Sequence, residues 1–97
     1  MKILQFDIKD FNPDCMSADE LDQWSEFIGN GRRPAIAKQW FPGIKGQFKL
    51  ARYVKHYCVN KSVAIALRLK GEIQTASNYE HICDRIYKED LQPHVNW

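Results

Sequence analysis

The chain has 97 residues, of which 44% are hydrophobic and 12% aromatic, which suits one domain with its own core. No apolar run approaches the roughly 18–20 residues of a membrane helix, and Asp7 falls where a signal peptide needs apolar residues. The three cysteines are an odd number in a short chain and do not predict a disulfide framework. We therefore expect a single domain, 1–97, in the cytoplasm.

The net charge of +2 conceals three blocks of different sign. Residues 1–30 carry seven acidic and two basic residues, and residues 71–97 carry five acidic and two basic ones. Between them, residues 31–70 carry ten basic residues and no acidic one. Such segregation indicates a charged partner or two lobes that attract each other.

The first predicted element is a half-buried β-strand over residues 2–9, where Leu4, Phe6 and Ile8 alternate with polar residues. Its partner is not evident, and the tail 94–97 and the segment 61–70 are both candidates. A turn at 12–14 follows.

A helix is predicted over 18–28, because Ser17 and Glu20 have the spacing of a capping box. Four apolar residues from Leu21 to Ile28 share one face, and Gly29 can take the left-handed position after the helix. The connector 29–46 is rich in glycine and proline and has room for a short helix over 34–40.

The second half of the chain predicts further helices. An apolar stripe from Leu50 to Cys58 predicts a helix over 47–58, and Asn60 is a candidate cap for the next segment. Residues 61–70 could be a strand or a buried helix, and we choose helix because Gly71 supplies a stop. With a helix over 72–89, this segment forms an antiparallel hairpin. The expected fold class is α+β: a mostly helical, compact domain with a short N-terminal β-strand and a C-terminal helical hairpin.

The sequence offers little sign of metal or cofactor chemistry. His56 and Cys58, like His81 and Cys83, are two residues apart, and on a helix such residues point about 200° away from each other. Neither pair can therefore chelate zinc. We expect no metal site, no cofactor and no catalytic residue.

Two opposite surfaces are candidates for binding. The basic one combines Lys45, Lys49, Arg52 and Lys55, on the side of helix 47–58 away from its apolar stripe. These cations could contact phosphates, with Trp40, Tyr53 and Tyr57 available for stacking, although Tyr53 and Tyr57 lie on the apolar stripe. A ribonuclease toxin is a third alternative, because His56, Tyr53, Arg52 and Lys55 are the residue types it would use.

The acidic surface would instead bind a basic partner. Carboxylates three or four residues apart on a helix lie about 5–6 Å from each other, and a rigid acidic surface could occupy a DNA-binding groove on another protein. The candidate residues are Asp7, Asp10, Asp14, Asp19, Asp22 and Glu26.

The whole chain resembles a small phage-type anti-CRISPR protein of the type I-F class. The resemblance rests on the opening Met1–Asp7, the acidic helix from Ser17 to Glu26, and the closing hairpin. It implies a non-enzymatic inhibitor that binds Cas subunits of the crRNA-guided surveillance complex and blocks target DNA, with DNA mimicry by the acidic residues as one mechanism. The leading hypothesis is therefore an inhibitor in the host cytoplasm, and the first alternative is a small basic protein that binds nucleic acid.

Overall fold

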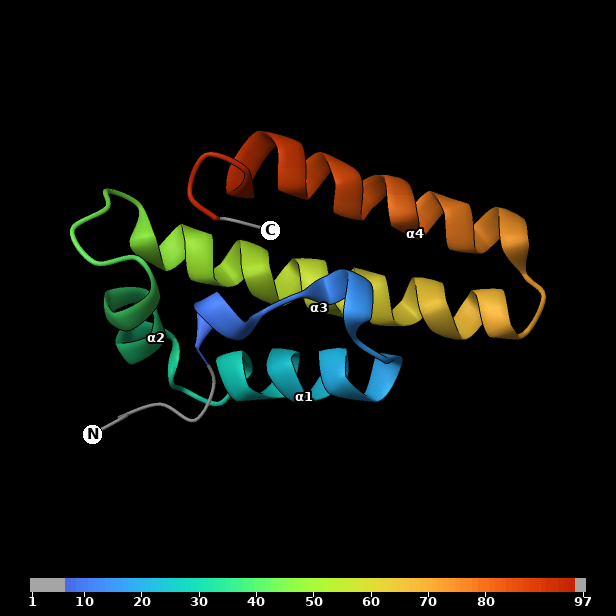
Figure 1. Cartoon of the computed structure of the whole chain (residues 1–97), viewed down its shortest axis with the longest axis horizontal. Helices are drawn as coiled ribbons and strands as arrows, with labels where there is room; N and C mark the ends of the chain where they lie inside the picture. Colours follow the sequence, from blue (N-terminus) through green and yellow to red (C-terminus); the bar gives the residue numbers. More distant parts are fainter. Residues whose placement is uncertain (1–6, 96–97) are drawn as a thin grey trace.

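The computed structural model describes residues 7–95 and shows a long central helix with helices on either side of it (Figure 1). Within these residues there are four α-helices: α1 (Ala18–Gly29), α2 (Arg33–Trp40), α3 (Gln47–Leu69) and α4 (Ile73–Ile86). Two 3₁₀ turns, η1 (Ile8–Asp10) and η2 (Pro13–Cys15), precede α1, and a π-helical turn, η3 (Tyr87–Leu91), follows α4.

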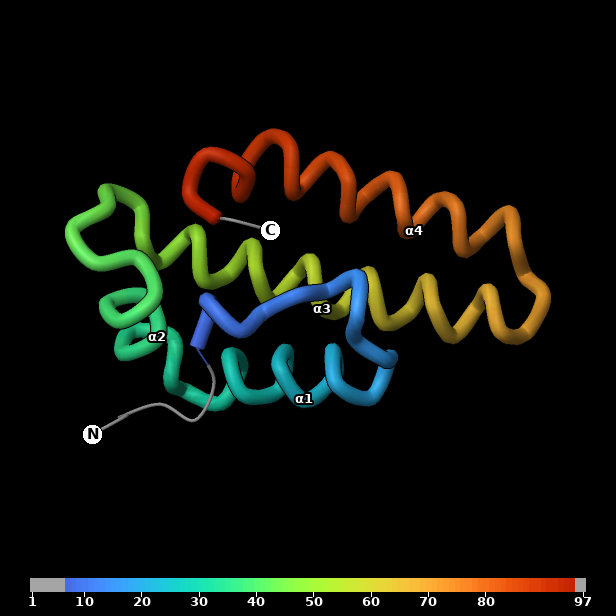
Figure 2. Tube along the Cα trace, viewed as in Figure 1, coloured from blue at the N-terminus to red at the C-terminus, as the bar shows by residue number. Residues whose placement is uncertain are grey.

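Helix α3 organises the molecule. Its 23 residues span about 35 Å at 1.5 Å per residue, which accounts for most of the 42 Å long axis. α1 and α4 pack on opposite sides of α3, α2 packs near its beginning, and the N-terminal segment crosses in front of it (Figure 1). The tube in Figure 2 follows the sharp reversal between α3 and α4 that makes these two helices antiparallel.

The predicted α+β class is wrong, because no β-strand occurs among residues 7–95. Residues 2–6 of the predicted strand, and the last two residues of the tail proposed as its partner, lie outside the described part of the chain. Its remaining residues enter the 3₁₀ turn η1, where the Asp7 carboxylate accepts a hydrogen bond from the backbone N–H of Lys9 at 3.0 Å. This local side-chain bond competes with strand pairing.

The prediction of two helices over 47–58 and 61–70 is corrected to one continuous helix. Asn60 does not cap a new helix; its side-chain amide donates back to the carbonyl of His56 at 2.7 Å, within α3. No glycine or proline interrupts residues 47–70, so nothing in the backbone breaks the helix. The choice of helix for 61–69, and of a helical hairpin closed at Gly71 (φ 85°), is confirmed.

The helix predicted over 18–28 is confirmed with its capping box. Ser17 and Glu20 exchange the two reciprocal hydrogen bonds, and Leu21, Trp24, Phe27 and Ile28 are buried. One detail differs: Gly29 is the last helical residue, and the positive φ of 74° belongs to Gly31. The predicted short helix near Pro34 is also present, as α2.

The core lies where the four helices and the N-terminal segment meet. The Trp24 ring lies 4.9 Å from that of Phe11 in an edge-to-face arrangement and 5.7 Å from that of Trp40. Trp24 therefore joins the N-terminal segment, α1 and α2 in one cluster, which also includes Phe41 and Leu91. This cluster fixes which face of α3 remains open to solvent.

Candidate functional site

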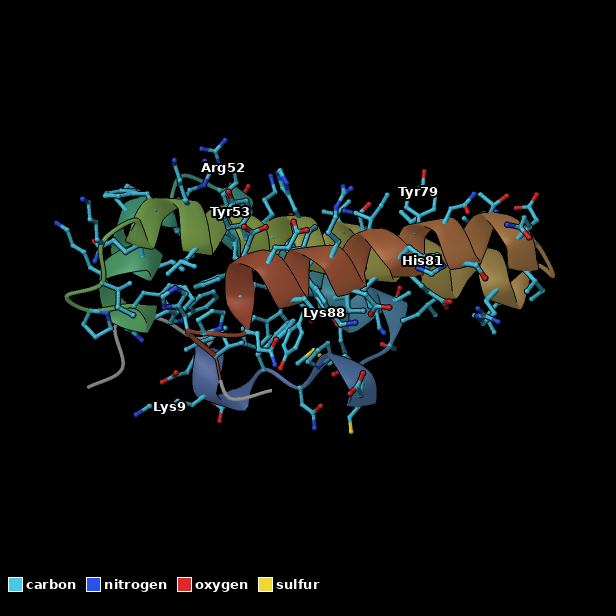
Figure 3. All side chains as sticks on the ribbon, turned by 90° about the horizontal axis from the view of Figure 1, so that it is seen from above. Lys9, Arg52, Tyr53, Tyr79, His81 and Lys88 are labelled. Carbon is cyan, nitrogen blue, oxygen red and sulfur yellow. The ribbon has the colours of Figure 1, made fainter. Side chains whose placement is uncertain are left out.

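The outward face of the first half of α3 is basic. Phe48, Lys49, Arg52 and His56 lie within about 100° of one another on the helix, and all four are exposed. We call these four residues the outer α3 strip. In Figure 3, Arg52 lies at the edge of the molecule opposite to the N-terminal segment with Lys9. The strip therefore faces away from the N-terminal segment, whose described acids are Asp7, Asp10 and Asp14.

The strip is exposed because the opposite side of α3 is used for the core. Leu50, Val54, Tyr57 and Cys58 are buried against α1, α2 and α4, as the apolar stripe predicts. The neighbouring helices cover these residues on α3 and leave the outer α3 strip uncovered.

The cations on this surface are not neutralised. Within the described residues, the side chains of Lys45, Lys49 and Arg52 form no ion pair and no hydrogen bond, and all three are exposed. The absence of acids from residues 31–70 explains this, since neighbours three or four residues away on α3 are never carboxylates. Three of the four predicted basic site residues are thus available to an anionic partner.

Lys55, the fourth, lies elsewhere. Its ammonium nitrogen is 3.0 Å from the position that a Cβ of Gly29 would occupy, so Lys55 packs across the C-terminal end of α1. A cation there interacts favourably with the negative end of the helix dipole. Lys55 therefore has a local structural role, and Gly29 lets it approach.

The aromatic residues on the binding surface differ from those that the sequence indicated. Trp40 and Tyr57 are buried, and Tyr53 is partly buried against the core, so they do not present free faces for stacking. Phe48 does: it is 50% exposed and lies on the same face of α3 as Arg52. Sequence reasoning missed Phe48, although its place outside the apolar stripe was the available signal.

The six predicted acidic residues do not form one free surface. Asp7 caps η1, Asp14 pairs with the Lys61 ammonium at 4.0 Å, and the Asp22 carboxylate accepts a 2.6 Å hydrogen bond from the hydroxyl of buried Ser62. The bond to Ser62 joins α1 to α3, so it uses one oxygen of the Asp22 carboxylate within the molecule. Apart from Asp7, which is partly buried, the predicted acidic residues are exposed: Asp10, Asp14, Asp19, Asp22 and Glu26.

The two H-x-C pairs divide between surface and core. His56 and His81 are exposed, whereas Cys58 and Cys83 are buried and the Cys83 thiol donates to the Tyr57 carbonyl at 3.7 Å. Among residues 7–95 no three His, Cys, Asp or Glu side chains are grouped to hold a metal ion. For the ribonuclease hypothesis, only Arg52 and His56 share the outer α3 strip, and it stays a prediction.

The environments of the thiols predict a strong difference in reactivity. Burial, with Cys83 nearby, raises the pKa of Cys58, and burial raises the pKa of Cys83 to about 11. Because the thiolate is the reactive form, we expect a thiol reagent at pH 8 to modify Cys15 quickly and the other two only after unfolding. The number of thiols that react quickly in the native protein, measured spectroscopically, checks this expectation. The control is Cys15→Ser, which should abolish the fast reaction. Two or more fast thiols in the native protein would contradict it.

No protein-family model, curated protein sequence or solved structure matches this chain. In the region from residue 7 to residue 95, no helix is long and apolar enough to cross a membrane. The inhibitor hypothesis, with Cas subunits as partners, therefore stays a prediction. The geometry of the outer α3 strip carries the functional argument.

Proposed function

We propose that this protein binds single-stranded nucleic acid through the outer α3 strip together with Lys45. The observation that carries the proposal is that two unpaired cations, Lys49 and Arg52, share one face of α3 with the half-exposed Phe48, and that unpaired Lys45 lies in the turn just before this helix. Cations contribute the phosphate contacts that dominate nucleic-acid affinity, and an exposed aromatic ring can stack on an unpaired base. An acidic protein partner could also contact these cations, but such binding would not require the exposed ring of Phe48.

The proposed recognition is independent of base sequence. Lys49 and Arg52 are one helical turn apart, and the Arg52 guanidinium can hold a phosphate through two parallel hydrogen bonds. Stacking on Phe48 accepts any base because every base has a π-face. We propose that the protein binds nucleic acid without catalysing a reaction on it, and that it does so in the cytoplasm.

Salt dependence gives the proposal a quantitative form. Three phosphate contacts to a single strand predict a slope of log affinity against log salt of about −2, because each contact contributes about −0.7. Affinity should then fall roughly 20-fold between 50 and 200 mM salt. A slope near zero would show that phosphates are not bound.

The experiment compares variants with equal changes in net charge. Fluorescence anisotropy of a labelled single-stranded oligonucleotide, about 20 nucleotides long so that it exceeds the 4–16 nucleotides typical of one binding site, reports affinity. We expect Arg52→Glu to lower affinity roughly tenfold or more, because an attraction to phosphate becomes a repulsion. The matched control is Lys9→Glu, which reverses an exposed charge on the opposite side of the molecule (Figure 3) and should change affinity little.

Phe48→Ala separates this proposal from simple charge attraction. Loss of stacking is worth about 1–3 kcal/mol per base, so affinity should fall by roughly fivefold to 150-fold with an unchanged salt slope. Equal losses for Lys9→Glu and Arg52→Glu, or no binding of DNA or RNA at low salt, would overturn the proposal.

A further inference from the structure

A second surface feature lies on the other side of α3 from the basic strip. A pocket of about 260 Å³ opens between η2, α3 and the junction of α4 with η3. It is lined by Pro13, Asp14, Tyr57, Asp84 and Tyr87. Because Tyr57 belongs to the buried side of α3, this pocket is separate from the outer α3 strip.

The lining combines negative charge with aromatic rings and includes no cation. The Asp84 carboxylate is exposed, and within the described residues it forms no ion pair and no hydrogen bond. Asp14 has one cationic neighbour, the Lys61 ammonium, at 4.0 Å, which is the outer limit of an ion pair. The pocket therefore offers carboxylate charge to a cationic ligand.

The Tyr57 phenol is a neutral hydrogen-bonding group in this pocket. Burial raises its pKa first, and the nearby Cys83, Asp14 and Asp84 raise it further, so it keeps its proton at physiological pH. Both carboxylates line the same pocket as Tyr57. Tyr57 thus adds polarity without adding a third negative charge.

The backbone at the pocket is unusual too. Tyr87 is the first residue of the π-helical turn η3, in which the backbone N–H of Gln92 donates to the Tyr87 carbonyl at 2.6 Å. Single π turns are rare and occur frequently at functional sites. Here the turn begins at a pocket residue, Tyr87.

We propose that this pocket binds a small, free organic cation that carries a guanidinium or ammonium group on a short aliphatic stem. Asp84 supplies the counter-charge, Asp14 adds a second carboxylate, and Tyr87, which is partly exposed, contacts the stem together with the small part of Tyr57 that lines the pocket. A volume of about 260 Å³ lies just below the range of about 300–1,000 Å³ typical of drug-sized ligands, which limits the ligand to a short molecule. A metal ion fits less well, because no third acidic, His or Cys ligand joins the two carboxylates within the described residues.

Nuclear magnetic resonance titration with butylguanidine tests the proposal. We expect saturable shifts at Tyr57, Asp84 and Tyr87, with a dissociation constant on the order of 1 mM, as befits a ligand of so few atoms. Butylurea, which has nearly the same shape without the charge, should bind at least roughly tenfold more weakly if charge recognition dominates. Equal binding of the two compounds, or no saturable shift, would overturn the proposal.

Asp84→Asn and Glu26→Gln form the matched pair of variants. Each removes one exposed carboxylate that has no partner among the described residues, so both should fold normally. We expect roughly tenfold weaker binding of butylguanidine for Asp84→Asn and no change for Glu26→Gln. If both variants weakened butylguanidine binding equally, binding would depend only on the net charge of the protein, and the proposed site at Asp84 would be wrong. N-acetylarginine methylamide mimics a peptide-borne guanidinium, and tighter binding of that compound would overturn the assignment to a free molecule.

Discussion

Trp24→Ala should lower the free energy of unfolding by about 3–5 kcal/mol, the range for truncating a buried tryptophan. Only 6% of the Trp24 surface is exposed, and its ring contacts those of Phe11 and Trp40 from two other parts of the chain. Truncation leaves a cavity and removes both ring contacts, and the pairs add about 0.5–1.5 kcal/mol each beyond burial. Since small domains are stable by only about 5–15 kcal/mol, this single change should leave a substantial unfolded fraction at moderate urea.

Urea unfolding followed by far-ultraviolet circular dichroism measures this loss. Phe48→Ala is the control, because it truncates an aromatic ring that is half exposed on α3 and should cost less than about 1 kcal/mol. The contrast also tests the central claim about the surface. If the two variants lost equal stability, Phe48 would be a core residue and could not serve as a stacking platform.

The helices with strong local signals were predictable from the sequence. Ser17 and Glu20 define the start of α1 through side-chain and backbone groups three residues apart, which needs no tertiary information. Gly71 ends α3 for a similarly local reason, because its φ of 85° favours glycine. Errors arose where local and tertiary effects compete: the strand assignment near Ile8 ignored the Asp7 cap, and Asn60 acts inside a helix although it is also a good cap residue.

The candidate sites show a different limit. The sequence explains why Lys49 and Arg52 have no carboxylate neighbour along α3, because residues 31–70 contain no acid. Charge counts leave open which of these cations a partner meets. They could not show that Asp22 binds Ser62, a residue 40 positions away, or that Lys55 packs against Gly29. Pairing across helices depends on how α1 lies on α3. The pocket at Asp84 was inaccessible for the same reason, since its residues come from three separate parts of the chain.

Alkaline pH should destabilise the protein steeply, beginning near pH 9. The interface of α3 and α4 buries Cys58, Cys83 and the Tyr57 phenol, and burial raises the pKa of each. A raised pKa means that the folded state keeps its proton at a pH where the unfolded state releases it. The stabilisation is therefore complete below the ordinary thiol pKa of 9.0 and is lost as pH rises above it, with the contribution of Cys83 exhausted near its folded pKa of about 11.

The expected loss of stability at pH 10 comes mainly from the thiols of Cys58 and Cys83. Each thiol lowers the free energy of unfolding by about 1.4 kcal/mol for every pH unit above its pKa in the unfolded state. The free energy of unfolding at pH 10 should therefore be about 3 kcal/mol below its value at pH 7.5. Urea unfolding under reducing conditions at both pH values measures the difference.

The double variant Cys58→Ala/Cys83→Ala should be less stable at neutral pH and yet lose less than about 1 kcal/mol between the two pH values. Cys15→Ser should retain the full pH dependence, because Cys15 is exposed. If all three proteins lost the same stability at pH 10, the thiols would not be buried between α3 and α4, and the packing that holds α4 against the central helix would have to be revised.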